Sequence, residues 1–149
     1  MDDITRILGG LRQAADLPEL LAGSWQAFEL ARELADTAAG LSADLYPAFA
    51  FARGAAVSGR NELAAAPSLP LQAAGSPARV ASCEDAGQAA DMLALLASAL
   101  TASLRTAAGQ ARDTADRLAC ENAAGHAARM HSLLAASPQS DGASAARPR

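Results

Sequence analysis

The sequence predicts an all-α fold, an up-down bundle of four main helices with a short N-terminal helix added. Two αα-hairpins, joined by a proline-rich crossover loop, make up the bundle. Apolar residues recur with helical periodicity along most of the 149 residues, and 42 residues are alanine, the strongest helix former. All seven prolines lie near expected helix starts or outside the periodic segments. We assign residues 1–136 to a single domain and residues 137–149 to a disordered tail.

Two helices are expected before residue 40. Gly9-Gly10 weakens the first by about 1 kcal/mol per glycine, so this helix orders by docking on the rest. The second opens at Leu17-Pro18-Glu19, because proline and glutamate suit a first turn, and Gly40 ends it. The first helix carries Ile4, Ile7, Leu8, Leu11 and Ala15 on one face. The buried arc of the second holds Leu20, Leu21, Ser24, Ala27, Phe28, Ala31, Leu34, Ala35 and Ala38.

The third helix is expected from Tyr46-Pro47 to about Ala66. Its apolar residues lie on several sides, which is typical of a helix packed between others, so we predict that it is the central helix. Pro67, Pro70 and Pro77 break the helical pattern and predict a crossover loop of residues 67–81.

The fourth and fifth helices follow the crossover. Ser82 is the expected N-cap of the fourth, which ends near Gly109, and the fifth covers residues 111–135. The apolar arcs of the two helices differ by about 90°, which favours a hairpin over one long rod. The fourth helix buries Ala89, Met92, Leu93, Leu96, Leu100, Leu104 and Ala107. The fifth points Ala115, Leu118, Ala119, Met130 and Leu133 inward.

Composition predicts a cytoplasmic bacterial protein from a high-GC genome. The apolar run 92–104 spans about 20 Å as a helix, too short for a bilayer core of about 30 Å, so it is expected to be a core helix. The N-terminus is acidic, unlike a secretory signal, and two cysteines are too few for a disulfide framework. All 12 basic residues are arginine, while the net charge is −4 and the arginines are scattered. Nucleic acid and membrane partners are therefore not expected.

No catalytic motif is present, so no enzymatic activity, metal or cofactor is expected. The chain lacks a Walker loop, Gly-x-Gly-x-x-Gly, His-Glu-x-x-His and Cys-x-x-Cys. Di-iron bundle enzymes need two Glu-x-x-His pairs, and neither His126 nor His131 has a glutamate three residues before it. The two histidines are about 140° apart on the helix, and His131 lies on its solvated side with Asp113 and Arg117.

Three residues of the fifth helix, Asn122, His126 and Met130, recur at intervals of four within its apolar arc. A buried Asn–His pair needs hydrogen-bond partners, and one interpretation is a polar pair that sets the helix register. The alternatives are a ligand contact, a pH-sensitive switch, since imidazole titrates near neutrality, or metal binding.

The aromatic residues all lie in one short stretch of the second and third helices. We expect Trp25, Phe28, Tyr46, Phe49 and Phe51 to form one bulky cluster in a core of small residues. Trp25 lies at the edge of its buried arc near Arg32, a pairing typical of binding hot spots, or else lies across a seam of the bundle. With Leu95, an apolar residue expected to be exposed, Trp25 and Arg32 form our candidate interaction set.

Arg53 and Arg60 are seven residues apart and share one side of the third helix. Each is expected to pair with an acid of the second helix, such as Glu29, Glu33 or Asp36. Alternatively, the two guanidinium groups form an anion-binding pair in a cleft.

These features favour a non-enzymatic protein–protein interaction or assembly module that forms a homodimer. Alanine buries little apolar area, so a bundle rich in alanine gains from burying a further face. The alternative is a small-ligand sensor or carrier with a pocket inside the bundle, which requires Arg53, Arg60, Asn122 and His126 to converge.

Overall fold

The structure of the chain, a computed structural model, describes residues 2–70 and 85–135. The prediction for residues 137–149 and most of the predicted crossover lie outside the described residues. The described part consists of helices and short connections and contains no strand, which confirms the all-α fold.

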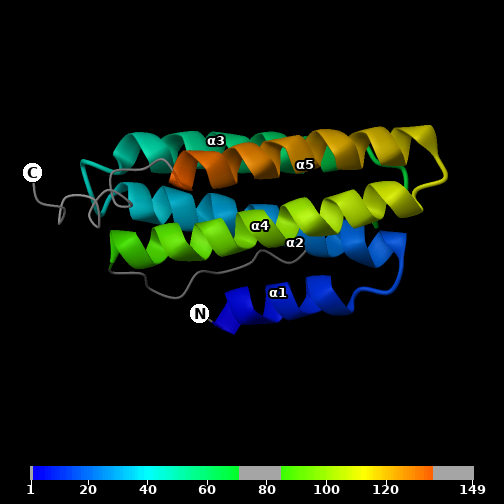
Figure 1. Ribbon diagram of the computed structural model, residues 1–149, viewed down its shortest axis with the longest axis horizontal. Coiled ribbons are helices and arrows are strands. Elements are labelled where there is room, and N and C mark those ends of the chain that lie inside the picture. Colours follow the sequence, from blue (N-terminus) through cyan, green and yellow to red (C-terminus); the bar gives the residue numbers. More distant parts are fainter. Residues whose placement is uncertain (1, 71–84, 136–149) are drawn as a thin grey trace, which may run out of the picture.

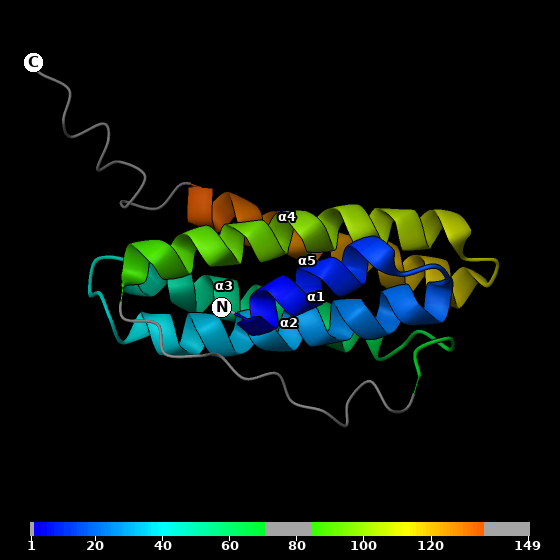
Figure 2. The same ribbon diagram turned by 90° about the horizontal axis from the view of Figure 1, so that it is seen from below.

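Five helices make up the bundle: α1 (Asp2–Gln13), α2 (Leu17–Ala39), α3 (Tyr46–Leu63), α4 (Ala86–Gln110) and α5 (Thr114–Ala135). The hairpins α2–α3 and α4–α5 pack together, so that α2 contacts α4 and α3 contacts α5 (Figure 1). Each helix of the four runs antiparallel to both of its neighbours. Because α3 ends at the opposite end of the bundle from the start of α4, the link between them must span the bundle length, as an up-down bundle with a crossover requires (Figure 2).

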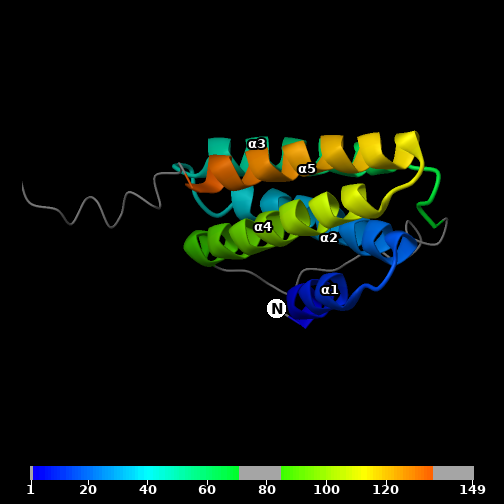
Figure 3. The same cartoon turned by 45° about the vertical axis from the view of Figure 1, so that its right-hand side comes forward.

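Helix α1 forms an outer layer on α2 and α4 (Figure 3). It buries four of the five predicted apolar residues, whereas Ala15 lies beyond its end and is exposed. The prediction that α3 is the central helix is wrong. Helices α2 and α4 each contact three other helices, while α3 packs against α2 and α5. The alanines on several sides of α3 therefore lie partly on its solvent-exposed face.

Several helix ends are set by local chemistry, some of it different from the prediction. The side chain of Asp16 accepts a hydrogen bond from the backbone N–H of Glu19 (3.0 Å) and so caps α2, which ends before Gly40 as predicted. Asp85, rather than the predicted Ser82, caps α4, because its carboxylate accepts from the N–H of Gly87 (2.9 Å). The helical part of α3 ends at Leu63, three residues before the predicted Ala66.

The α4–α5 connection is a hairpin. Helix α4 ends at Gln110, and the carboxylate of Asp113 accepts from the N–H of Ala115 (2.7 Å) at the start of α5. Helix α4 is also the one described helix long and apolar enough to cross a membrane by length and composition. Its seven predicted core residues are all buried, and it packs against α1, α2 and α5, as expected of a core helix.

The predicted arc of α2 is confirmed, but the inward face of α5 is wrongly predicted. All nine residues expected inside on α2 are buried. On α5, Leu118 is 55% exposed and Leu133 is half-buried. The inward face of α5 is mostly small, and it consists of Asp116, Ala119, Cys120, Ala123, Ala124, Ala127, Met130 and Leu134.

The aromatic residues do not form one cluster. Phe28 and Phe49 are fully buried, and Trp25 packs half-buried against the core. Tyr46 and Phe51, in contrast, are 56% and 64% exposed. The aromatic residues of α3 thus alternate between the core and solvent.

Candidate functional site

The seam between α2 and α3 contains a network of charged side chains around Glu29. Its carboxylate is an ion-pair partner of Arg32 on the same helix (3.3 Å) and of Arg60 on α3. The guanidinium of Arg60 also lies over the ring of Trp25, 5.8 Å from its centroid, a cation–π arrangement. Further along the seam, Arg53 pairs with Asp36 (3.3 Å). Each arginine of α3 therefore pairs with an acid of α2, as predicted, and the alternative of two free guanidinium groups in a cleft is not found.

This network places Trp25 across the α2–α3 seam of the chain itself, where Arg60 covers its ring. Arg32 pairs with Glu29 and Glu33 on its own helix. Leu95 is 56% exposed on α4, a helix that contacts α2 but lies diagonally from α3. The three candidate interaction residues therefore do not form one patch, and only Leu95 is largely exposed.

A second polar cluster joins α5 to α3 at Glu62. Asn122 donates a hydrogen bond from its side-chain nitrogen to one Glu62 oxygen (3.3 Å), and Nε2 of His126 lies 3.7 Å from the other. The prediction of a buried Asn–His pair is wrong, because Asn122 is exposed and both side chains approach Glu62 instead of each other. The buried Nδ1 of His126 has no hydrogen-bond partner within residues 2–70 and 85–135.

The four residues proposed for a ligand pocket do not converge. Arg53 and Arg60 face α2, while Asn122 and His126 meet α3 on its other flank, at Glu62. The helical period explains the separation, because Arg60 and Glu62 are two residues apart and their side chains diverge by about 200°. The side chains of α3 thus contribute to two separate clusters, and neither contains all four residues.

The sequence analysis missed a buried carboxylate, Asp116, at the start of α5. Its side chain is 2% exposed and accepts two hydrogen bonds from Ser68, one from the backbone N–H (3.0 Å) and one from the hydroxyl (2.6 Å). These bonds attach the segment after α3 to α5. The only signal in the sequence was an acid in a first turn, which predicts a local cap and not a contact with a residue 48 positions away.

Cys120 lies one turn after Asp116 and is fully buried. Burial, together with the negative charges of Asp116 and Glu121, raises the pKa of its thiol from 9.0 to about 11. The folded chain therefore keeps this proton at a pH where the unfolded chain loses it. A thiol of this kind is a poor nucleophile, because the thiolate is the reactive form.

The raised pKa of Cys120 predicts how stability depends on pH. Its contribution to the free energy of unfolding is complete below pH 9 and falls as the pH rises from about 9 to about 11. Urea unfolding of Cys83→Ala across this range checks the prediction, and Cys83→Ala combined with Cys120→Ala is the control. The double variant is expected to lose less stability over the same range, so parallel pH curves would contradict the assignment.

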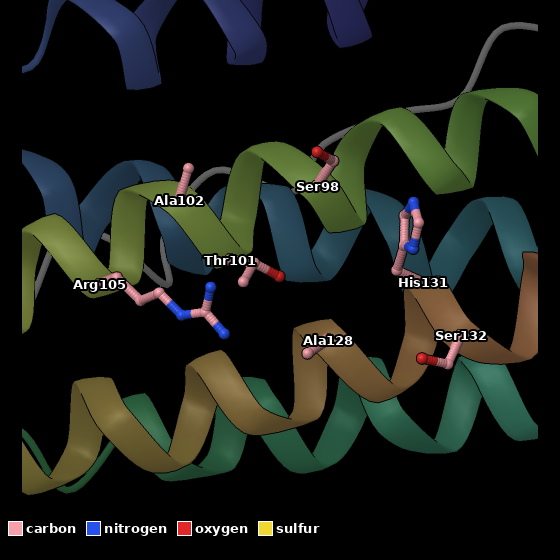
Figure 4. A pocket seen from close by; sticks show the side chains of 7 residues that line it. All are labelled: Ser98, Thr101, Ala102, Arg105, Ala128, His131 and Ser132. Atoms are coloured by element: carbon pink, nitrogen blue, oxygen red, sulfur yellow. The ribbon is translucent and has the colours of Figure 1, made fainter.

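The α4–α5 pair carries a surface groove of about 410 Å³ on the side where Arg105 and His131 meet (Figure 4). His131 is exposed, as predicted, and forms part of this groove. Elsewhere in the described part of the chain, no group of three or more histidine, cysteine, aspartate or glutamate side chains is arranged to hold a metal ion.

Comparisons with known proteins add no further assignment. No family model, curated protein or solved structure matches this chain. The arrangement of its own residues is therefore the basis for a functional proposal.

Proposed function

We propose that this chain is a non-enzymatic protein–protein interaction module that assembles as a homodimer through the outer face of α3. The observation that carries the proposal is the exposure of Phe51, whose ring is 64% exposed and the most exposed of the large apolar side chains described. Burying such a side chain contributes about 1.5–3 kcal/mol. A second copy of the chain would supply that burial.

The outer face of α3 is also uncharged over about four turns. It consists of Pro47, Ala50, Phe51, Gly54, Ser58 and Asn61. In contrast, the exposed residues of α2 include Glu33 and Asp36, and those of α5 include Glu121 and Arg129. Interface centres are poor in charged residues and rich in aromatic ones, so the α3 face has the composition of such a centre.

A second copy is the partner that this face fits best. A twofold dimer packs the same surface against itself, so a charged face would place like charges opposite each other, whereas the α3 face carries none. Gly54 at its middle has no atom within 4 Å of where a Cβ would lie, so a partner helix can approach its backbone closely. The small alanine core supports the proposal as well, since a further buried face adds stability.

Native mass spectrometry of the wild type and of Phe51→Glu tests this function. The wild type is expected at twice 15.0 kDa, and Phe51→Glu at 15.0 kDa, because a buried dimer contact cannot accommodate two unpaired carboxylates. Leu95→Glu is the matched control, since Leu95 is similarly exposed on α4. A monomeric wild type, or a dimer that Leu95→Glu dissociates and Phe51→Glu does not, would contradict the proposed interface.

The proposal retains the bacterial origin and cytoplasmic location that the composition predicts. The alternative function, a small-ligand sensor, loses its original basis because the four candidate pocket residues lie in two clusters. The α4–α5 groove is the feature of the described residues that favours a ligand.

A further inference from the structure

The groove between α4 and α5 is lined by basic and hydroxyl side chains and by no carboxylate. Four residues come from α4 and three from α5: Ser98, Thr101, Ala102, Arg105, Ala128, His131 and Ser132. In Figure 4 the Arg105 side chain extends from α4 toward α5, and its guanidinium lies beside Ala128. Because Ala128 has only a methyl group, the space in front of the guanidinium stays open.

Arg105 differs from the arginines of the α2–α3 seam in having no acidic partner. Arg32, Arg53 and Arg60 each pair with a carboxylate within 4 Å. Arg105 makes no ion pair with any residue in the described ranges, and its side chain belongs to an exposed residue at the groove. A guanidinium group in this state can donate two parallel hydrogen bonds to an incoming anion.

The donors of the groove suit an anion with three terminal oxygens. Arg105 can bind two of them in a fork, and the Ser132 hydroxyl and the His131 ring lie on the other wall (Figure 4). Thr101 adds no donor, because its hydroxyl donates to the backbone carbonyl of Ala97 (2.8 Å). A carboxylate has two oxygens, which the guanidinium alone would satisfy. A phosphate group can use the arginine, the serine and the histidine together.

We propose that the α4–α5 groove binds the phosphate group of a phosphate monoester. The net charge of the chain is −4, so attraction depends on these local donors and not on the overall field of the protein. The site is separate from the outer face of α3 and does not depend on the proposed dimer. It would give the interaction module a ligand that could bias its assembly.

The test is a titration of the full chain with inorganic phosphate, followed by amide chemical shifts in two-dimensional NMR. Saturable shifts are expected in residues 98–105 and 128–132, with a dissociation constant of about 1–10 mM for this minimal probe. Arg105→Ala should weaken binding at least about tenfold, because it removes both hydrogen bonds of the fork. The exposed Arg105 is not part of the core, so the variant is expected to fold.

Arg129→Ala is the matched control. Arg129 is an exposed arginine of α5 that lies at a different groove, with Glu62 and Glu121, and its loss should change the affinity less than about twofold. Absence of saturable shifts at 50 mM phosphate would overturn the proposal. Equal weakening in the two variants would overturn it too, since it would indicate diffuse charge attraction or an adventitious ion only.

Vesicles that contain phosphatidic acid separate the two sources of a phosphate monoester. Sedimentation of the protein with these vesicles, lost in Arg105→Ala and kept in Arg129→Ala, would assign the groove to a lipid headgroup. Saturable phosphate shifts without sedimentation would assign it to a soluble phosphate monoester. Both results support the proposed chemistry, whereas sedimentation that survives Arg105→Ala without phosphate shifts would overturn it.

Discussion

Replacement of Gly59 by alanine is expected to lower the free energy of unfolding by about 2–3 kcal/mol. A Cβ at this position would lie 2.4 Å from Cζ and 2.5 Å from Cε1 of the Phe28 ring. Phe28 is fully buried between α2 and its neighbours, so the ring cannot move toward solvent to relieve the contact. The higher helix propensity of alanine, worth up to about 1 kcal/mol, offsets only part of this cost. Urea unfolding followed by circular dichroism measures the change.

Gly125→Ala is the control for this prediction, because Gly125 is exposed and has no atom within 4 Å of its Cβ position. It should raise stability by about 0.5–1 kcal/mol. A second variant, Phe28→Leu, makes room at Gly59, so Gly59→Ala should cost less in its background than in the wild type. Equal stability of Gly59→Ala and Gly125→Ala would show that α2 and α3 do not pack this closely.

Replacement of Asp116 by alanine is expected to cost about 2–3 kcal/mol. The substitution removes two hydrogen bonds to a charged acceptor and leaves the N–H of Ser68 without this partner. The segment after Leu63 should then separate more readily from α5. Hydrogen exchange at the Ser68 amide is therefore expected to accelerate more than exchange at core amides of α2, and chemical unfolding gives the total loss.

A double-mutant cycle with Ser68→Ala isolates the interaction. Asp116→Ala should cost less in the Ser68→Ala background, because the hydroxyl bond is already absent there. Asp91→Ala removes an exposed carboxylate of α4 and should stay within about 0.5 kcal/mol of the wild type. If Asp116→Ala also stays within that range, with unchanged exchange at Ser68, the carboxylate does not hold the two segments together.

Helix positions and two of the inward faces could be predicted from the sequence because they depend on local patterns. Large apolar residues define one arc of α2 and one arc of α4, and the structure buries both arcs. The pairing of Arg53 and Arg60 with acids of α2 was also predictable, since side chains of both signs lie on the facing sides of two consecutive helices. These inferences needed only the helical period and the order of the helices.

The inward face of α5 could not be predicted in the same way. Nearly half of its inward residues are alanines, whose small side chains give little contrast between the two faces. The larger Leu118 therefore pulled the predicted arc toward solvent, and with it Asn122 and His126 were placed in the core. Their common partner, Glu62, lies 60 positions from Asn122 in the sequence, so no local pattern connects them.

The sequence by itself determined the all-α class, the breaks between helices and the helix faces that carry large apolar residues. Those properties follow from backbone propensity and the helical period, which act over a few residues. The tertiary structure alone decided which helix stands opposite which face. It therefore decided the bond from Ser68 to Asp116, the contact of Phe28 with Gly59 and the exposure of Phe51. In a core of small side chains, packing between distant segments selects these contacts, because many helix rotations bury nearly the same apolar area.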